Sequence, residues 1–357
     1  MTYSRREEDA IVLDSFEELT YKNKYLLLGG LNGSNPNFNK NTPLLIKSLS
    51  EGVYNKVKDK FSDVDYRRQI LGSLECKKVT CVTFFSENYP EDLRQIPNPP
   101  VVLYCKGNLS LLKDRKFAIV GSRRTQPNIL RECSKISGEL SKKFTIVTGM
   151  ADGADSAAVE GAIEGGKLIS VLAYGFDYSY PAVSERLIKK VEIKGLLLSE
   201  YPPQIPPKSY QFPVRNRIIA GLADAVLVVS AGKKSGALIT ADYAVEYGKQ
   251  VMAFPYGVGI TYGAGCNYLI KQGANLVENT LDICEAFGIE YEQPGRQIEL
   301  SKDEQTALSA IREAGEAFAP EIAKKLNKLP HQLIPVLSSL EIKGLIIRLG
   351  GNRYAAV

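Results

Sequence analysis

Apolar runs of strand length alternate with helix-like stretches through the centre of the chain. The runs lie at residues 116–120, 145–147, 168–173, 196–199, 225–229 and 250–254. Helix-like stretches follow the first two runs, at residues 128–142 and 157–164. Strands that are apolar throughout and separated by helices are typical of a parallel sheet covered on both faces. The centre therefore predicts an α/β fold built on a parallel sheet.

The patterns on either side of this centre differ from it. Residues 1–70 predict a helical N-terminal accessory region, and residues 71–290 predict one Rossmann-like domain that begins with strands at 79–84 and 101–104. Beyond a linker at 288–295, Ser301 and Glu304 have the spacing of a capping box that opens a helix. Two further helices, near 320 and 331, and a terminal pair of β runs predict a C-terminal winged-helix domain over 298–357.

Composition limits the cellular compartments and the kinds of site that we expect for this chain. The net charge of +5 favours anionic partners only where the cations are clustered. Six scattered cysteines without a Cys-x-x-Cys pair, and a charged N-terminus, predict a cytoplasmic protein with no zinc site. No run approaches the ~20 apolar residues of a membrane span. His331 is the only histidine, which excludes a histidine-based triad, metal site or general base from the central domain.

Three glycine-bearing turns follow the predicted strands, where ligands bind in parallel sheets. Their candidate phosphate-binding residues are Gly121, Ser122, Arg123, Arg124, Gly149, Lys233, Lys234, Ser235 and Gly236. Glycine lets backbone amides approach a phosphate, and Arg or Lys adds full charge. The chain has no Gly-x-Gly-x-x-Gly and no Gly-x-x-x-x-Gly-Lys-Ser/Thr motif, so we expect no dinucleotide or Mg-ATP cofactor. The alternative is that each turn is a tight connection without a ligand, with Arg123 and Arg124 in solvent.

The most informative stretch is residues 201–221, where cations and aromatic residues alternate. The candidates here are Lys208, Phe212, Arg215, Asn216 and Arg217. This mixture suits single-stranded DNA, because cations follow the backbone while an exposed ring stacks on a base for roughly 1–3 kcal/mol. The alternative is that Phe212 is buried and that Arg215 and Arg217 tie the loop to carboxylates such as Asp224.

Ordered motifs across residues 78–285 resemble the DprA/Smf family. They are Tyr89-Pro90, Pro99-Pro100, and the segments 118–123, 148–151, 180–181, 199–201, 212–222, 234–241 and 265–270. The resemblance implies a protein that binds incoming single-stranded DNA during natural transformation, helps to load the RecA recombinase, and forms a homodimer through its Rossmann-like domain. It also implies that Gly121, Ser122 and Arg123 contact the DNA backbone and that Phe212 stacks. Lys234 and Arg215 complete the basic pocket, with Lys208 as an addition.

The sequence departs from the family pattern in three turns. The segment 153–159 lacks the usual histidine, the segment 229–231 lacks a carboxylate beside the proposed pocket, and Pro255 is followed by Tyr256 rather than glycine. Loss of that carboxylate makes the predicted pocket more receptive to phosphate.

Two rival functions come from other classes. A nucleotide phosphoribohydrolase with a related fold would carry Pro-Gly-Gly-x-Gly-Thr and a following glutamate, but the segment 233–240 lacks that acid, and we expect no enzyme activity. A winged tail that reads duplex DNA would need contacts on its third helix, where His331 and Gln332 are the only candidates. We therefore expect a partner-binding or regulatory tail.

Overall fold

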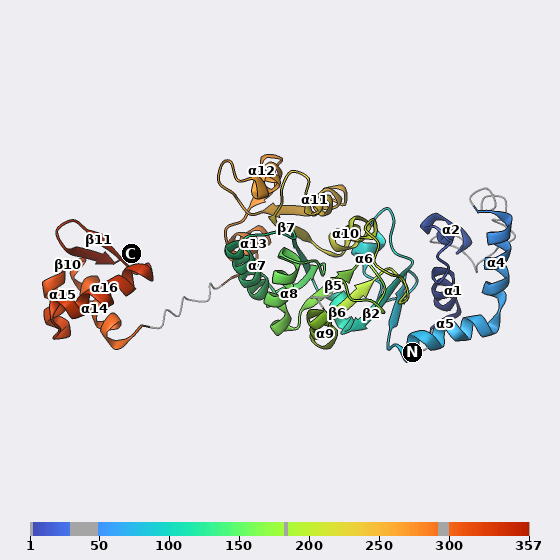
Figure 1. Ribbon diagram of the computed structural model, residues 1–357, viewed down its shortest axis with the longest axis horizontal. Helices are drawn as coiled ribbons and strands as arrows, with labels where there is room; N and C mark the ends of the chain where they lie inside the picture. The colour runs from blue at the N-terminus through green and yellow to red at the C-terminus, as the bar shows by residue number, and fades with distance from the viewer. Residues whose placement is uncertain (1–2, 29–48, 182–184, 292–299, 357) are drawn as a thin grey trace. The chain divides into compact units, whose positions relative to one another are not determined.

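The computed structural model describes residues 3–28, 49–181, 185–291 and 300–356. Contacts divide the chain into two compact units, Met1–Ile289 and Glu290–Val357 (Figure 1). The N-terminal helices therefore share a unit with the central sheet. The division into 1–70, 71–290 and 298–357 stays a prediction. Residues 292–295, the second half of the expected linker at 288–295, lie outside the described residues.

The first unit is built on a mixed sheet whose central strands are parallel. Its order is β1-β2-β6-β5-β4-β3-β7-β8-β9. The strands are β1 (Thr80–Thr83), β2 (Val102–Gly107), β3 (Lys116–Gly121), β4 (Thr145–Thr148), β5 (Leu168–Leu172), β6 (Leu196–Ser199), β7 (Ala225–Ser230), β8 (Gln250–Ala253) and β9 (Asn275–Leu276). The strands from β6 to β9 in this order pair in parallel, whereas β1 and β2 pair antiparallel with each other and β2 pairs antiparallel with β6. The predicted α/β fold with a parallel central sheet is confirmed.

Helices cover both faces of this sheet. They are α6 (Glu91–Arg94), α7 (Pro127–Leu140), α8 (Ala154–Ala162), α9 (Glu185–Lys194), α10 (Gln211–Leu222), α11 (Gly236–Glu246), α12 (Ala264–Lys271) and α13 (Thr280–Ala286). Figure 1 shows α7 and α8 on one side of the sheet and α10 and α11 on the other. Ala118 and Val120 of β3 pack against α10 and α11 in one core cluster. Because side chains alternate along a strand, Phe117 and Ile119 belong to the opposite face.

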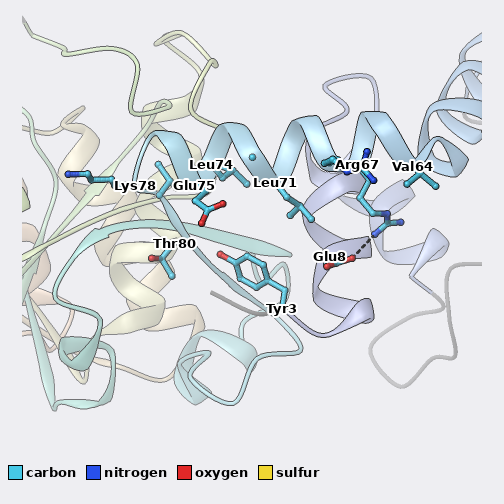
Figure 2. A pocket seen from close by; sticks show the side chains of 12 residues that line it. Tyr3, Glu8, Val64, Arg67, Leu71, Leu74, Glu75, Lys78 and Thr80 are labelled. Atoms are coloured by element: carbon cyan, nitrogen blue, oxygen red, sulfur yellow. Dashed lines mark ion pairs between the residues drawn. The ribbon is translucent and has the colours of Figure 1, made fainter.

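The N-terminal helices pack on the antiparallel edge of the sheet. They are α1 (Arg5–Asp14), α2 (Tyr21–Leu27), α4 (Glu51–Ser62) and α5 (Val64–Cys76). Their core cluster joins Ile11 and Leu13 of α1 to Val102 and Tyr104 of β2. A pocket of about 650 Å³ lies between α5, Tyr3 and the start of β1. Figure 2 shows Arg67 reaching from α5 toward Glu8 of α1, at 3.6 Å, and none of the predicted site residues lines this pocket.

The second unit has its own small core. Its elements are α14 (Lys302–Ala314), β10 (Glu316–Phe318), α15 (Ala319–Leu326), α16 (Pro330–Ile342), β11 (Ile346–Leu349) and β12 (Arg353–Ala356). The predicted capping box opens α14, since the Ser301 amide donates to Glu304 Oε2 at 2.7 Å and the Glu304 amide donates to Ser301 Oγ at 3.2 Å. The strands form an antiparallel sheet in the order β10-β12-β11. The expected three helices and terminal hairpin are present, and the winged-helix assignment stays a prediction.

None of the helices in the described part of the chain is long and apolar enough to cross a membrane.

Candidate functional site

A cavity opens at the carboxyl ends of the central strands, beside β3. In the sheet, β3 lies between β4 and β7. The chain leaves β3 through α7 to reach β4, and it leaves β7 through α11 to reach β8 on the other side. The two loops therefore diverge at the point where strand order reverses, and ligands bind at such points in parallel sheets. The cavity has a volume of about 350 Å³ and is lined by both loops and by α10.

The loop after β3 forms one wall of the cavity, and glycine lets it pack closely. A Cβ on Gly121 would lie 2.6 Å from the Ala154 Cβ and 2.9 Å from a methyl group of Val229. The Ser122 amide donates to the Ser230 carbonyl oxygen at 2.8 Å, and the Ser122 and Ser235 hydroxyls lie 3.2 Å apart. The loops after β3 and β7 are therefore locked to each other, which fixes the backbone that an anion would meet.

Helix α10 supplies the opposite wall. Phe212, Arg215 and Asn216 all line the cavity, because residues three and four apart share one face of a helix. The Asn216 amide group donates to the Gly236 carbonyl oxygen at 3.2 Å, which ties α10 to the start of α11. The Phe212 ring is half-buried, and the Arg123 guanidinium lies over it, 5.3 Å from the ring centroid. The ring is therefore at the cavity surface rather than sealed in the interior.

Arg215 and Asp155 form the charged floor of the cavity. Arg215 is 5% exposed; its guanidinium donates to the Val171 carbonyl oxygen and to Asn216 Oδ1 at 3.3 Å. Burial raises the pKa of Asp155 to about 6, against the opposing effects of the Arg215 charge and the Ala151 amide. Gly149 lies behind this floor, where a Cβ would collide with both Asp155 and Arg215. Gly149 therefore supports the site without lining the cavity.

Further predicted cations lie next to the wall residues in sequence. Arg124, Lys233 and Lys234 are exposed, beside Arg123 and Ser235, which line the cavity. Within residues 3–28, 49–181, 185–291 and 300–356, none of these three side chains nor Arg123 forms an ion pair. The flanks of the cavity therefore carry positive charge that no described carboxylate neutralises.

Two predicted residues belong elsewhere, and this corrects the expected grouping. Lys208 and Arg217 line a second cavity of about 260 Å³, formed with α1 and α2. Arg217 is 8% exposed and its guanidinium pairs with Glu200. The physical reason is helical geometry, because one further residue beyond Asn216 turns the side chain by about 100° away from the Phe212 face. The alternative of an ion-paired Arg217 holds, with Glu200 rather than Asp224 as the partner.

Two residues near the cavity were absent from the sequence candidates. Asp155 lines the floor, and its place directly after the glycine turn at 149–153 is a signal that could have identified it. The Tyr180 ring lies 5.6 Å from the Phe212 ring, centroid to centroid. Its Tyr-Pro motif was part of the family pattern, but nothing in the sequence indicates that the loop after β5 reaches α10.

Comparisons with known proteins agree with this geometry. The profile described as DNA recombination-mediator protein A matches residues 80–288. The DNA processing protein DprA of Streptococcus pneumoniae is 40% identical over 216 residues, which are 60% of this chain and 77% of that protein. The Bacillus subtilis DprA is 36% identical over 232 residues, which are 63% of this chain and 78% of that protein.

Solved structures give the same result. The X-ray structure of the Streptococcus pneumoniae DprA aligns with a TM-score of 0.62 and 30% identity, over 82% of this chain and all of that chain (100%). The Helicobacter pylori DNA processing protein A, a structure that addresses its single-stranded DNA binding mode, aligns with a TM-score of 0.55 and 30% identity, over 60% of this chain and 98% of that chain. This chain therefore belongs to the DNA recombination-mediator protein A family, also called DprA/Smf.

Proposed function

We propose that this chain is a recombination mediator that binds single-stranded DNA in the cavity beside β3. The observation that carries the proposal is the convergence of the Gly121–Arg123 loop, the Ser235–Gly236 turn and the half-buried Phe212 ring around one cavity. Backbone amides and unpaired cations suit phosphate, and the ring suits an unstacked base. A duplex keeps its bases stacked, so this combination favours a single strand.

Arg123 has a double part in this binding. Its guanidinium lies over the Phe212 ring, and the same side chain is exposed next to the amides of the β3 loop. When a strand binds, we expect Arg123 to contact a phosphate while a base stacks on Phe212. The contact of Arg123 with a phosphate releases counterions condensed on the strand, so the affinity should fall steeply with salt.

The test is fluorescence anisotropy with a labelled oligo-dT at several salt concentrations. Phe212→Ala should weaken binding by about 1–3 kcal/mol, roughly 5- to 150-fold in Kd. Arg123→Ala should weaken binding and reduce the salt slope by about 1. Arg68→Ala, which removes an exposed arginine of α5, is the control and should bind as the wild type does. Equal, salt-insensitive binding by all three variants would refute the proposal.

We propose that the cavity acts by binding alone. Among the described residues, Asp155 is the only carboxylate that lines it, and the segment 233–240 has no acid that could act as a nucleophile or general acid. The rival phosphoribohydrolase activity requires release of free base from nucleoside monophosphates. Chromatography after prolonged incubation at high protein concentration should detect no base, and its appearance would favour the enzyme.

The proposal extends to RecA as the partner and the cytoplasm as the compartment. Support for RecA comes from the family, whose description is that of a recombination mediator. Support for the compartment comes from the cysteines, because all six are free thiols, as is usual in a reducing environment. Capture of RecA by the immobilised chain in the presence of oligo-dT tests the partner.

We also propose a homodimer formed through the β9 edge of the sheet. Among the described strands β9 has β8 as its one neighbour, and an open strand edge pairs readily with another chain. Exposed apolar side chains lie on the same edge elements, with Leu276 of β9 47% exposed and Tyr268 of α12 58% exposed. Light scattering should give twice the mass of the chain, and Leu276→Glu should give the monomer mass. A monomeric wild type would contradict this part.

A further inference from the structure

The loop after β5 brings an exposed aromatic ring beside the candidate cavity. Tyr180 is 42% exposed, and its ring centroid lies 5.6 Å from that of Phe212 with 57° between the ring planes. Tyr180 stands on a different loop from every residue predicted to bind DNA. Two aromatic side chains from separate segments, the loop between β5 and α9 and helix α10, therefore lie together, and one of them, Phe212, lines the cavity.

The backbone holds Tyr180 in this place. The buried Tyr174 hydroxyl donates to the Tyr180 carbonyl oxygen at 2.7 Å and accepts from the Tyr180 amide at 3.0 Å. Both polar groups of the Tyr180 backbone are thus fixed by one side chain that is 1% exposed. A backbone segment that is fixed before a ligand arrives loses little conformational entropy on binding.

The spacing of the two rings fits adjacent, unstacked bases. The 5.6 Å between centroids exceeds the roughly 3.4 Å rise of stacked bases along a strand. Because the rings are inclined to each other, they present faces in different directions, and two neighbouring bases can each use one only if they are splayed apart. A flexible single strand can adopt that geometry, whereas a duplex cannot.

The charges of the loop do not oppose this arrangement. Its acid, Asp177, forms an ion pair with Lys77 at 2.5 Å, so its charge is compensated. Arg123, whose guanidinium lies over the Phe212 ring, supplies a cation. A strand that passes from Arg123 over Phe212 toward Tyr180 therefore meets a cation first and no uncompensated carboxylate on the loop.

We propose that Tyr180 is a second stacking residue of this groove and binds the nucleotide next to the one on Phe212. This inference rests on the proposed binding of single-stranded DNA and adds a residue and a direction to it. The strand leaves the cavity over the loop after β5 rather than toward Lys208, and the groove holds at least two consecutive bases apart.

The test uses the full chain and short oligo-dT in which one thymine is replaced by 2-aminopurine at successive positions. Stacking on an aromatic ring quenches this base. In the wild type, two neighbouring positions should be quenched. Tyr180→Ala should relieve one of them and weaken binding about 5- to 150-fold, while Phe212→Ala should relieve the other. Tyr180→Phe should behave as the wild type.

Two variants distinguish stacking of a base on Tyr180 from simple coverage of the Phe212 ring by the Tyr180 side chain. Tyr180→Leu fills the same place without an aromatic face, so it should behave as Tyr180→Ala. Wild-type affinity and quenching in Tyr180→Leu would overturn the inference. Tyr178→Ala removes a ring from the same loop with a similar exposure of 40% and should have no effect. If Arg123→Ala loses binding while Tyr180→Ala does not, this inference alone fails. If the wild type does not bind oligo-dT, the proposed function fails with it.

Discussion

At the scale of single residues, the floor of the cavity couples a titratable group to the site. Asp155 is 6% exposed, and its pKa of about 6 comes chiefly from burial, which penalises the carboxylate form. The charges of Arg215 and Arg123 act in the opposite direction and keep the shift from being larger. Near neutral pH Asp155 therefore carries a negative charge beside the positive charge of Arg215, close to the place where a phosphate would bind.

We predict that affinity for oligo-dT rises as the pH falls through about 6. Protonation removes the Asp155 charge, and a bound phosphate in turn favours the protonated form, so both effects have the same sign. Anisotropy titrations between pH 5 and pH 7.5 measure this, and thymine does not titrate in that range.

Asp155→Asn is the matched control for this pH dependence. The amide cannot ionise, so the variant should bind at neutral pH as tightly as the wild type does at low pH, with a flat profile across the range. A wild-type profile that is flat, or a variant that keeps the wild-type slope, would show that Asp155 does not set the pH response.

At the scale of elements, the two faces of α10 have different roles. One face carries Phe212, Arg215 and Asn216 in the cavity, and the other carries Arg217, whose guanidinium pairs with Glu200 after β6. Burial raises the pKa of Glu200, while the Arg217 charge opposes that rise. The pair therefore holds α10 against the sheet rather than binding a ligand.

We expect Arg217→Met to destabilise the fold, because it leaves Glu200 buried without its cation, a change that typically costs about 3–5 kcal/mol. Urea unfolding measures the loss. Adding Glu200→Gln should recover part of it, since coupled partners are not additive. The folded variant should bind oligo-dT within about twofold of the wild type. A stable Arg217→Met protein with the DNA defect of Arg123→Ala would assign Arg217 to the DNA site instead.

The sequence predicted the positions of the individual strands better than it predicted which elements lie next to one another. Apolar runs located the central strands, because burial on both faces leaves a clear signal. The same signal does not say which strands pair, so the antiparallel β1 and β2 and the meeting of Tyr180 with Phe212 were not foreseen. Arg215 and Arg217 lie two residues apart, and the sequence alone does not distinguish their roles. The turn of α10 places their side chains on different faces of the helix. The short β10 had too few residues for a periodic pattern.

At the scale of the whole molecule, the cavity proposed to bind DNA lies within one unit. Every residue that lines the cavity belongs to Met1–Ile289, and the second unit has a core of its own. We predict that a chain ending at Ile289 binds oligo-dT within about threefold of the full chain, with the same salt dependence. A large loss of affinity would show that Glu290–Val357 contributes contacts to the strand.

The contact of Arg123 with Phe212 has a consequence for selectivity. The Arg123 guanidinium already lies over the Phe212 ring, so a ligand that uses either group must first displace this internal contact. A nucleoside supplies only a base for the ring, and a free phosphate ion supplies only an anion for the guanidinium. A nucleotide unit of a strand supplies a base and a phosphate together and can compensate for the lost contact, so the groove should discriminate against nucleosides and against free phosphate.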